Sequence, residues 1–272
     1  AQITIQSSDI GSIGDQLSYI SDSSVTSITV AAPTGAFQTF DFTSLGVTNI
    51  GDIQFLDPAT TPSAAYFPNS NLAIQPSGSS LIYTVKSASS LKIDGLFGDI
   101  LNQGFDSPID LQPNLALINF PLNYQNTAIE IASVDTVVED TFTGFFDSLR
   151  LKRSMKIISL VDAYGKLNLP TLSDTVLRKY DIEITIDSLF GQVLGFWQPI
   201  TQTEATEYYY RYLAKNMDYY LLEAKTDSSG NVISAQYQSG TALIAGIVNY
   251  SNISCNGLTD GKAKVEAVGG VI

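Results

Sequence analysis

The chain has 272 residues, of which 44% are hydrophobic, so it can bury the core of one large β domain or of two smaller ones. It carries 14 basic and 27 acidic residues, and the net charge of −13 repels nucleic-acid phosphates and anionic lipid surfaces. The sequence contains no histidine, which excludes Ser-His-Asp and Cys-His catalysis, histidine-ligated metals and the usual general base near neutral pH.

The first half of the chain reads as short strands separated by turns. Turn sequences such as Pro33-Thr34-Gly35 and Asp57-Pro58 follow one another about every ten residues, which is typical of all-β domains. Segments 10–20 and 95–103 are the two candidates for a short helix or helical turn. The expected strands are 2–6, 25–31, 37–42, 52–56, 72–75, 80–86 and 89–93.

The second half contains longer strands with cleaner alternation. Between 176 and 187 the even positions are mostly apolar, as in Ile182 and Ile184, whereas the odd positions include Asp181 and Glu183. A period of two places these rows on opposite faces of a strand, so we expect the charged row to face water. Further strands are expected at 149–161, 207–213, 219–225 and 232–238, with excursions from the sheet at 113–121 and 194–199.

These elements predict an all-β fold that is either an antiparallel sandwich or a wide, curved, barrel-like sheet. Small residues at 239–246 are typical of a domain boundary. We therefore predict a large antiparallel β domain at 1–245 and a second, incomplete domain at 246–272.

The end of the chain reads as two strands joined by a turn. Asn256-Gly257 and Asp260-Gly261 tolerate positive φ angles, and 262–268 then alternates before Gly269-Gly270. The order ISCNG at 253–257, DG at 260–261, an alternating strand and GG at 269–270 resembles the start of the SprB-type repeat of Bacteroidetes surface proteins. This resemblance implies the first strands of an Ig-like β-sandwich; the alternative is an ordinary hairpin that closes the preceding domain. The single cysteine, Cys255, can form no internal disulfide, and we expect it to be a small buried apolar residue.

A second resemblance covers most of the remaining chain. It rests on FLDPATTP at 55–62, FP at 67–68, NLAI at 71–74, FPLNY at 120–124, AYGKLNLP at 163–170, LRK at 177–179, a tyrosine-rich strand and Trp197. Together these are similar to the N-terminal domains of secreted Bacteroidetes proteins that carry a type IX sorting signal. The chain also begins directly with strand-like residues, as a mature protein does after its signal peptide is removed.

The resemblances imply a non-enzymatic protein at the cell surface or outside the cell. The expected role is that of an adhesin or a surface-displayed binding domain, exported by the type IX secretion machinery and linked to gliding motility. Its expected partners are that machinery and other surface proteins or extracellular glycans, with no nucleic acid and no membrane span. The alternative is a lipocalin-like β-barrel that binds a small apolar ligand or a glycan. A carbohydrate-active enzyme is a third reading, and it requires two carboxylates that face each other in a cleft.

Aromatic residues provide the leading candidate for a recognition surface. On a strand, Tyr208, Tyr210 and Tyr212 share one face, and Tyr219 and Trp197 lie on neighbouring segments. Such rings suit stacking on sugars, although cross-strand packing within a sheet is the simpler explanation for the tyrosines.

Oxygen-bearing side chains at Asp227, Ser229 and Asn231 alternate as they do in calcium loops, and the acidic chain favours a divalent cation. The segment lacks the glutamate that completes such loops, so a hairpin turn is the simpler interpretation and no cofactor is expected apart from this weak Ca²⁺ site. Arg150 and Lys152 share a strand face and could pair with Asp181 and Glu183 across the sheet.

Four Asp-Ser/Thr-aliphatic triplets resemble the O-glycosylation motif of Bacteroidetes proteins. The resemblance implies glycans on Thr136, Ser148, Thr175 and Ser188.

Overall fold

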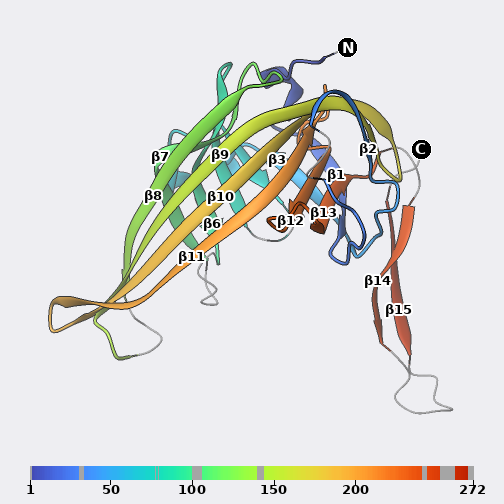
Figure 1. Cartoon of the computed structure of the whole chain (residues 1–272). Coiled ribbons are helices and arrows are strands. Elements are labelled where there is room, and N and C mark those ends of the chain that lie inside the picture. Colours follow the sequence, from blue (N-terminus) through green and yellow to red (C-terminus); the bar gives the residue numbers. More distant parts are fainter. Residues whose placement is uncertain are drawn as a thin grey trace.

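The structure is a computed structural model that describes residues 2–30, 34–76, 78, 80–99, 106–139, 144–240, 244–251 and 261–268. Strands account for 66% of the structure and helices for 4%, which confirms the all-β prediction (Figure 1). The helical part consists of single 3-10 turns at Ser7–Asp9, Pro58–Thr60 and Ala64–Tyr66.

The main sheet is built from thirteen strands, and the chain ends in a separate pair. In chain order the strands of the main sheet are β1 (Gln16–Asp22), β2 (Gly35–Asp41), β3 (Asn49–Leu56), β4 (Leu72–Gln75), β5 (Leu81–Lys86), β6 (Ser90–Gly98), β7 (Ser107–Asn119), β8 (Thr127–Glu139), β9 (Ser148–Asn168), β10 (Ser173–Val193), β11 (Phe196–Leu213), β12 (Leu222–Thr226) and β13 (Val232–Gln238). Neither segment considered as a helix forms one: 16–20 lie in β1 and 95–98 in β6, 10–15 hold an isolated bridge at Ile10 and a turn, and 100–105 lie outside the described residues.

The main sheet closes on itself into a barrel. Its order is β10-β11-β12-β13-β1-β3-β4-β5-β6-β7-β8-β9, and β9 pairs in turn with β10. All of these neighbours are antiparallel, and β2 joins from outside as a parallel partner of β9. Of the two architectures left open by the sequence, the structure has the barrel-like one.

The closure is weakest between β7 and β8. The two strands share a single ladder pair, Gln112 with Ser133, whereas β8 pairs with β9 along its whole length. Two side-chain hydrogen bonds also cross the gap: Ser133 Oγ donates to the Gln112 carbonyl at 2.8 Å, and Asn119 Nδ2 donates to Glu130 Oε1 at 3.0 Å. We call this gap the seam.

The barrel interior is lined by apolar side chains, and a further inner cluster from β6 to β9 includes Leu115, Val134 and Ile157. Residues from all sides of the ring, such as Phe55, Leu91, Val161 and Leu177, are buried in one cluster, so they must face inward. The N-terminal segment enters this cluster through Ile5, which bridges to the chain at Leu122. Because these side chains fill the interior, the ring is stabilised by a packed core.

A second core lies on the outer face of the barrel, beneath β2. Phe40 and Phe42 pack edge-on against Tyr212, with ring centroids 5.1 and 5.5 Å away. At the β2–β9 contact, a Cβ atom on Gly165 would lie 1.9 Å from the Gln38 carbonyl oxygen, so only glycine permits β2 to approach this closely.

One cation fixes the outer core in place. The Arg178 guanidinium is fully buried between the rings of Phe40 and Tyr210, 5.0 Å from each centroid. It donates to both carboxylate oxygens of Asp162, at 2.9 and 2.8 Å, and to the Val30 carbonyl at 2.8 Å. Arg178 thus attaches segment 23–48 to the barrel wall. We call this segment, which contains β2, the crossing segment.

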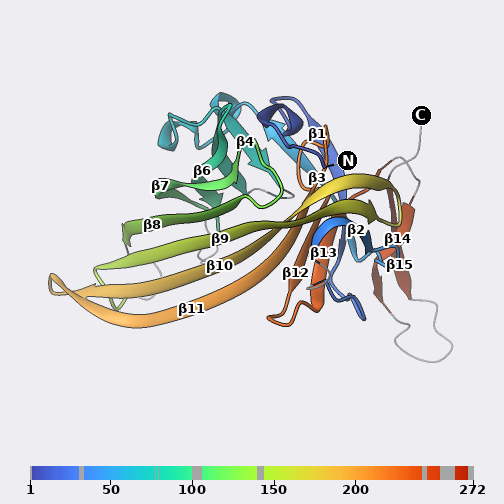
Figure 2. The same cartoon turned by 45° about the horizontal axis from the view of Figure 1, so that its top comes forward.

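Strands β8 to β11 extend beyond the barrel as a curved four-stranded arm (Figures 1 and 2). The β10–β11 hairpin turns at Leu194 and Gly195, whose φ angles of 51° and 82° fit a two-residue type I′ turn. The excursion predicted at 194–199 is therefore wrong, because Phe196 already belongs to β11. The other predicted excursion, 113–121, likewise lies mostly in β7.

Strands β14 (Ile244–Ser251) and β15 (Lys262–Val268) form an antiparallel pair that projects away from the barrel in Figure 1. The expected turn with Cys255 and the final glycines lie outside the described residues. The domain division at 245/246 and the Ig-like repeat remain predictions.

Candidate functional site

The charged row of β10 faces the barrel interior rather than water. Lys179 and Asp181 are 4% and 0% exposed, and Lys179 pairs with Val161, a member of the interior core. The prediction of a solvated charged face was wrong, because ring closure turns this face inward. The even positions Val176 and Tyr180 lie at the outer core.

Asp181 is the centre of the interior charge network. It accepts hydrogen bonds from Ser159 Oγ at 2.5 Å, from Lys179 Nζ at 2.5 and 2.6 Å, and from Arg211 Nη1 at 2.6 Å. Arg211 also contacts Glu183 and Glu223, each at 2.6 Å. The partners come from β9, β10, β11 and β12, so the network ties together one wall of the barrel.

Burial and pairing act in opposite directions on these groups. Burial alone would raise the pKa of Asp181, but the charges of Lys179 and Arg211 outweigh it and hold that pKa below its ordinary value. Burial lowers the pKa of Lys179, against the opposing effect of the Asp181 carboxylate. The network supplies paired charges of both signs rather than an unpaired acid or base.

The cations of β9 that were expected to pair with acids on β10 pair with an acid on β8 instead. Arg150 donates to both oxygens of Asp135 at 2.6 Å, and Lys152 lies 3.9 Å from the same carboxylate. The predicted pairing of these cations with Asp181 and Glu183 was wrong, because the two acids lie farther along the barrel wall, next to Lys179 and Arg211.

The five predicted recognition residues are not gathered into one surface. Tyr210 and Tyr212 share a face with the half-buried Tyr208, as expected, but both are buried in the outer core. Tyr219 packs in the barrel against Phe55, and Trp197 lies on the arm, 5.9 Å from the Arg150 guanidinium. Ligand recognition by these residues remains a prediction.

The buried tyrosines give the fold a distinctive alkaline behaviour. Burial raises the pKa of Tyr237 to about 12 and the pKa values of Tyr212, Tyr219 and Tyr220 well above their ordinary range. Since the folded state holds these protons more tightly, their stabilising effect is complete below pH ~10 and is lost as the pH rises through the folded-state values. As the pH is raised, we expect phenolate absorbance to increase in two steps. The exposed tyrosines ionise first, and the buried tyrosines ionise in a second step that coincides with loss of the circular dichroism of the folded chain. In denaturant, where all tyrosines are exposed, a single step should remain. A single step without denaturant, with the native structure retained, would contradict the burial of these rings.

The possible calcium loop is a hairpin turn between β12 and β13. The Asp227 carboxylate accepts hydrogen bonds from the backbone N–H groups of Ser229 and Asn231 at 2.8 and 2.9 Å, and from Asn231 Nδ2 at 2.8 Å. These bonds occupy the oxygens that a cation would need, and within the described residues no cluster of three or more Cys, Asp or Glu side chains could hold a metal. A Ca²⁺ role for the three residues remains a prediction without support from the geometry.

The predicted glycosylation residues are accessible to different degrees. Thr175 is exposed near the start of β10, whereas Thr136, Ser148 and Ser188 are half-buried on the arm. Their modification remains a prediction.

An exposed apolar surface on the outer face of β8 to β11, where the barrel wall continues into the arm, is the strongest site feature that sequence analysis missed. The strand register places Ile129, Ile158, Ile182 and Tyr208 in one row across β8 to β11. Paired residues share a face of the sheet, and this is the face of Tyr180 and Tyr210. We define the arm patch as Ile129, Ile131, Ile158, Leu160, Ile182, Ile184 and Tyr208.

The arm patch is open to solvent. Ile129, Ile131 and Leu160 are 63%, 56% and 39% exposed, and the other members are partly exposed. Lys156 lies in the same sheet row, between Ile131 and Ile184. Contiguous exposed apolar surface is typical of interaction sites. The signal in the sequence was the alternation of isoleucines with polar residues from position 129, which predicts a strand but not its exposure.

The end of the arm is also apolar. Phe145, Leu194 and Phe196 are 83%, 87% and 72% exposed. Leu194 adopts a positive φ angle that favours glycine, so a large apolar side chain is held outward at a position where the turn would prefer a small residue.

Comparison of the whole chain with protein-family models, with curated proteins and with solved structures finds no match. None of the helices in the described part of the chain is long and apolar enough to cross a membrane.

Proposed function

We propose that this chain is a non-enzymatic extracellular binding protein of the adhesin type, which holds a partner protein against the arm patch. The observation that carries the proposal is a set of seven apolar side chains, three of them exposed and four partly exposed, on the outer face of β8 to β11 where the barrel wall continues into the arm. The barrel anchors this arm through two cores and a buried charge network, so the arm patch is presented on a rigid support.

Two features favour a protein as the partner. Aliphatic side chains bury well against another apolar protein surface but offer little to a hydrated polysaccharide. Lys156 adds one positive charge, which suits an acidic group on the partner. Display on the cell surface, export by type IX secretion and a link to gliding motility complete the proposal, supported by the sequence resemblances.

The proposal is tested with beads coated with the chain and washed over films of mucin, serum albumin and cellulose. We expect retention on a protein-bearing film, and we expect the double variant Ile129→Asn, Ile131→Asn to weaken it by at least about tenfold, as loss of two central contacts does. The matched control is Ile233→Asn, since Ile233 is 50% exposed but lies on β13. Sedimentation of all three proteins verifies that self-association is unchanged. Equal retention of the double variant, or retention on cellulose alone, would refute the proposal.

A second function, a lipocalin-like barrel that binds a small apolar ligand or a glycan, is favoured by the closed ring. The interior that such a ligand would occupy is largely filled by the apolar core and the charge network, which leaves the seam as the place of entry.

A further inference from the structure

A cavity of about 190 Å³ opens into the barrel wall at the seam. One side is formed by β7 and the turn after it, including Leu117, Phe120 and Leu122, and the other side by Ala128 and Lys179. It exists because β7 and β8 share only one ladder pair, at Gln112 and Ser133, away from these residues. The volume corresponds to about six water molecules, which is room for one small ligand.

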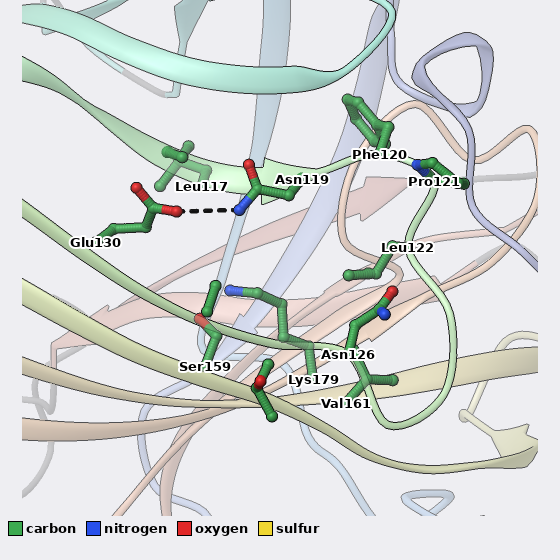
Figure 3. A pocket seen from close by; sticks show the side chains of 13 residues that line it. Leu117, Asn119, Phe120, Pro121, Leu122, Asn126, Glu130, Ser159, Val161 and Lys179 are labelled. Atoms are coloured by element: carbon green, nitrogen blue, oxygen red, sulfur yellow. Dashed lines mark hydrogen bonds between the residues drawn. The ribbon is translucent and has the colours of Figure 1, made fainter.

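The inner wall of the cavity presents a buried ammonium group. The Lys179 side chain is 5% exposed, and two of its three N–H donors are directed to Asp181. Figure 3 shows the amine pointing into the cavity, toward the space between Leu122 and Glu130. The third donor is therefore available to an acceptor oxygen inside the cavity.

The mouth of the cavity carries neutral and acidic polar groups. The Asn119 side chain donates to Glu130 across the seam at 3.0 Å, and Asn126 and Thr127 line the same opening. An anionic ligand would meet the Glu130 carboxylate at the mouth and a Lys179 charge already neutralised by Asp181. A neutral ligand with several hydroxyl groups meets donors and acceptors on one side and the Phe120 ring and leucines on the other.

We propose that the seam cavity binds a single neutral sugar ring, such as the terminal unit of a glycan. The hydroxyl oxygens accept hydrogen bonds from Lys179 and Asn119, and a hydroxyl O–H donates to the Glu130 carboxylate, while the apolar face of the ring lies against Leu117, Phe120 and Leu122. This site is independent of the arm patch, and either can fail without affecting the other.

The test is saturation-transfer NMR of the intact chain with the methyl glycosides of glucose, galactose, mannose and N-acetylglucosamine, and with N-acetylneuraminic acid as the anionic comparison. We expect at least one neutral glycoside to bind. Ala128→Leu, which fills the cavity from β8, should weaken that binding by at least about tenfold, and Asn119→Ala should weaken it less. The matched control is Ala205→Leu, since Ala205 is exposed on β11 and does not line the cavity.

Lysine 179 itself is left unchanged, because its removal would disturb the charge network. Binding that is equal in Ala128→Leu and the parent chain, loss of binding in Ala205→Leu, tighter binding of the anionic sugar, or no binding of any neutral glycoside would each overturn the proposal. Melting temperatures of all variants establish that they are folded.

Discussion

Replacement of Asp181 by alanine is expected to destabilise the fold by about 3–5 kcal/mol, because it leaves two buried cations without their shared counterion. Lys179 and Arg211 both contact this carboxylate, and Asp181 is 0% exposed. Denaturant unfolding followed by circular dichroism measures the loss.

Two comparisons separate this effect from a general loss of charge. Asp135→Ala removes the partner of Arg150, but both side chains of that pair are substantially exposed, at 47% and 31%, so the denaturation midpoint should change little. Because the folded-state pKa of Asp181 is lowered, its stabilising effect is complete above pH ~4 and is lost as the pH falls through the folded-state value. The acid side of the stability curve should therefore become shallower in Asp181→Ala. An unchanged midpoint in this variant would show that the network does not stabilise the barrel.

Replacement of Arg178 by leucine is expected to cost about 3–5 kcal/mol, because Asp162 would be left as an unpaired buried charge. The variant also removes the bond to Val30 and the stacking on Phe40, so the crossing segment 23–48 loses one of its attachments to the barrel, next to the β2–β9 pairing and the outer core. Limited proteolysis should then cleave within 23–48 before the rest of the chain is degraded, while unfolding experiments measure the loss of stability.

The matched control for Arg178 is Arg153→Leu. Arg153 makes the same two-bond contact with Asp187, at 2.6 and 2.7 Å, but these side chains are 17% and 28% exposed, compared with 1% and 8% for Arg178 and Asp162. The control should lose much less stability and show no early cleavage. Arg178→Lys should not restore the parent stability, since lysine cannot reproduce the bidentate contact and the stacking. Resistance of Arg178→Leu to proteolysis would show that the pairing with β9 and the apolar core hold β2 without Arg178.

The alternation of apolar and polar residues along the chain predicted strands correctly where it was strong. The alternation between 176 and 187 correctly separated two faces of β10, with Tyr180 and Ile182 on one and Asp181 and Glu183 on the other. Which face meets water depends on the closure of the ring, and the counterions of the inner row come from distant strands. No local pattern contains that information.

The two helix predictions were wrong for the same reason, since contacts with distant parts of the chain determine the structure of these segments. Residues Gln16–Asp22 pair with both β3 and β13, and these contacts outweigh the weak helical periodicity at 10–20. Gly95 lies in a strand where a Cβ atom would come within 2.0 Å of the Phe67 ring, a packing constraint set by a residue far away in the sequence. The seam cavity was equally beyond prediction, because it results from ladder pairs that β7 and β8 do not form.

The position of β1 in the ring has a consequence for how the protein folds. Tyr19 pairs with Gln238, so the first strand of the barrel finds one of its two neighbours 219 positions later, the difference between 238 and 19. Contacts of such long separation slow folding, since the entropy of closing the intervening chain must be overcome before the pairing gains anything. Until β13 is available, β1 and β12 each keep an open edge that could pair with other chains. We therefore expect a nascent or truncated chain that lacks β13 to aggregate more readily than the complete ring, because both of these edges stay open.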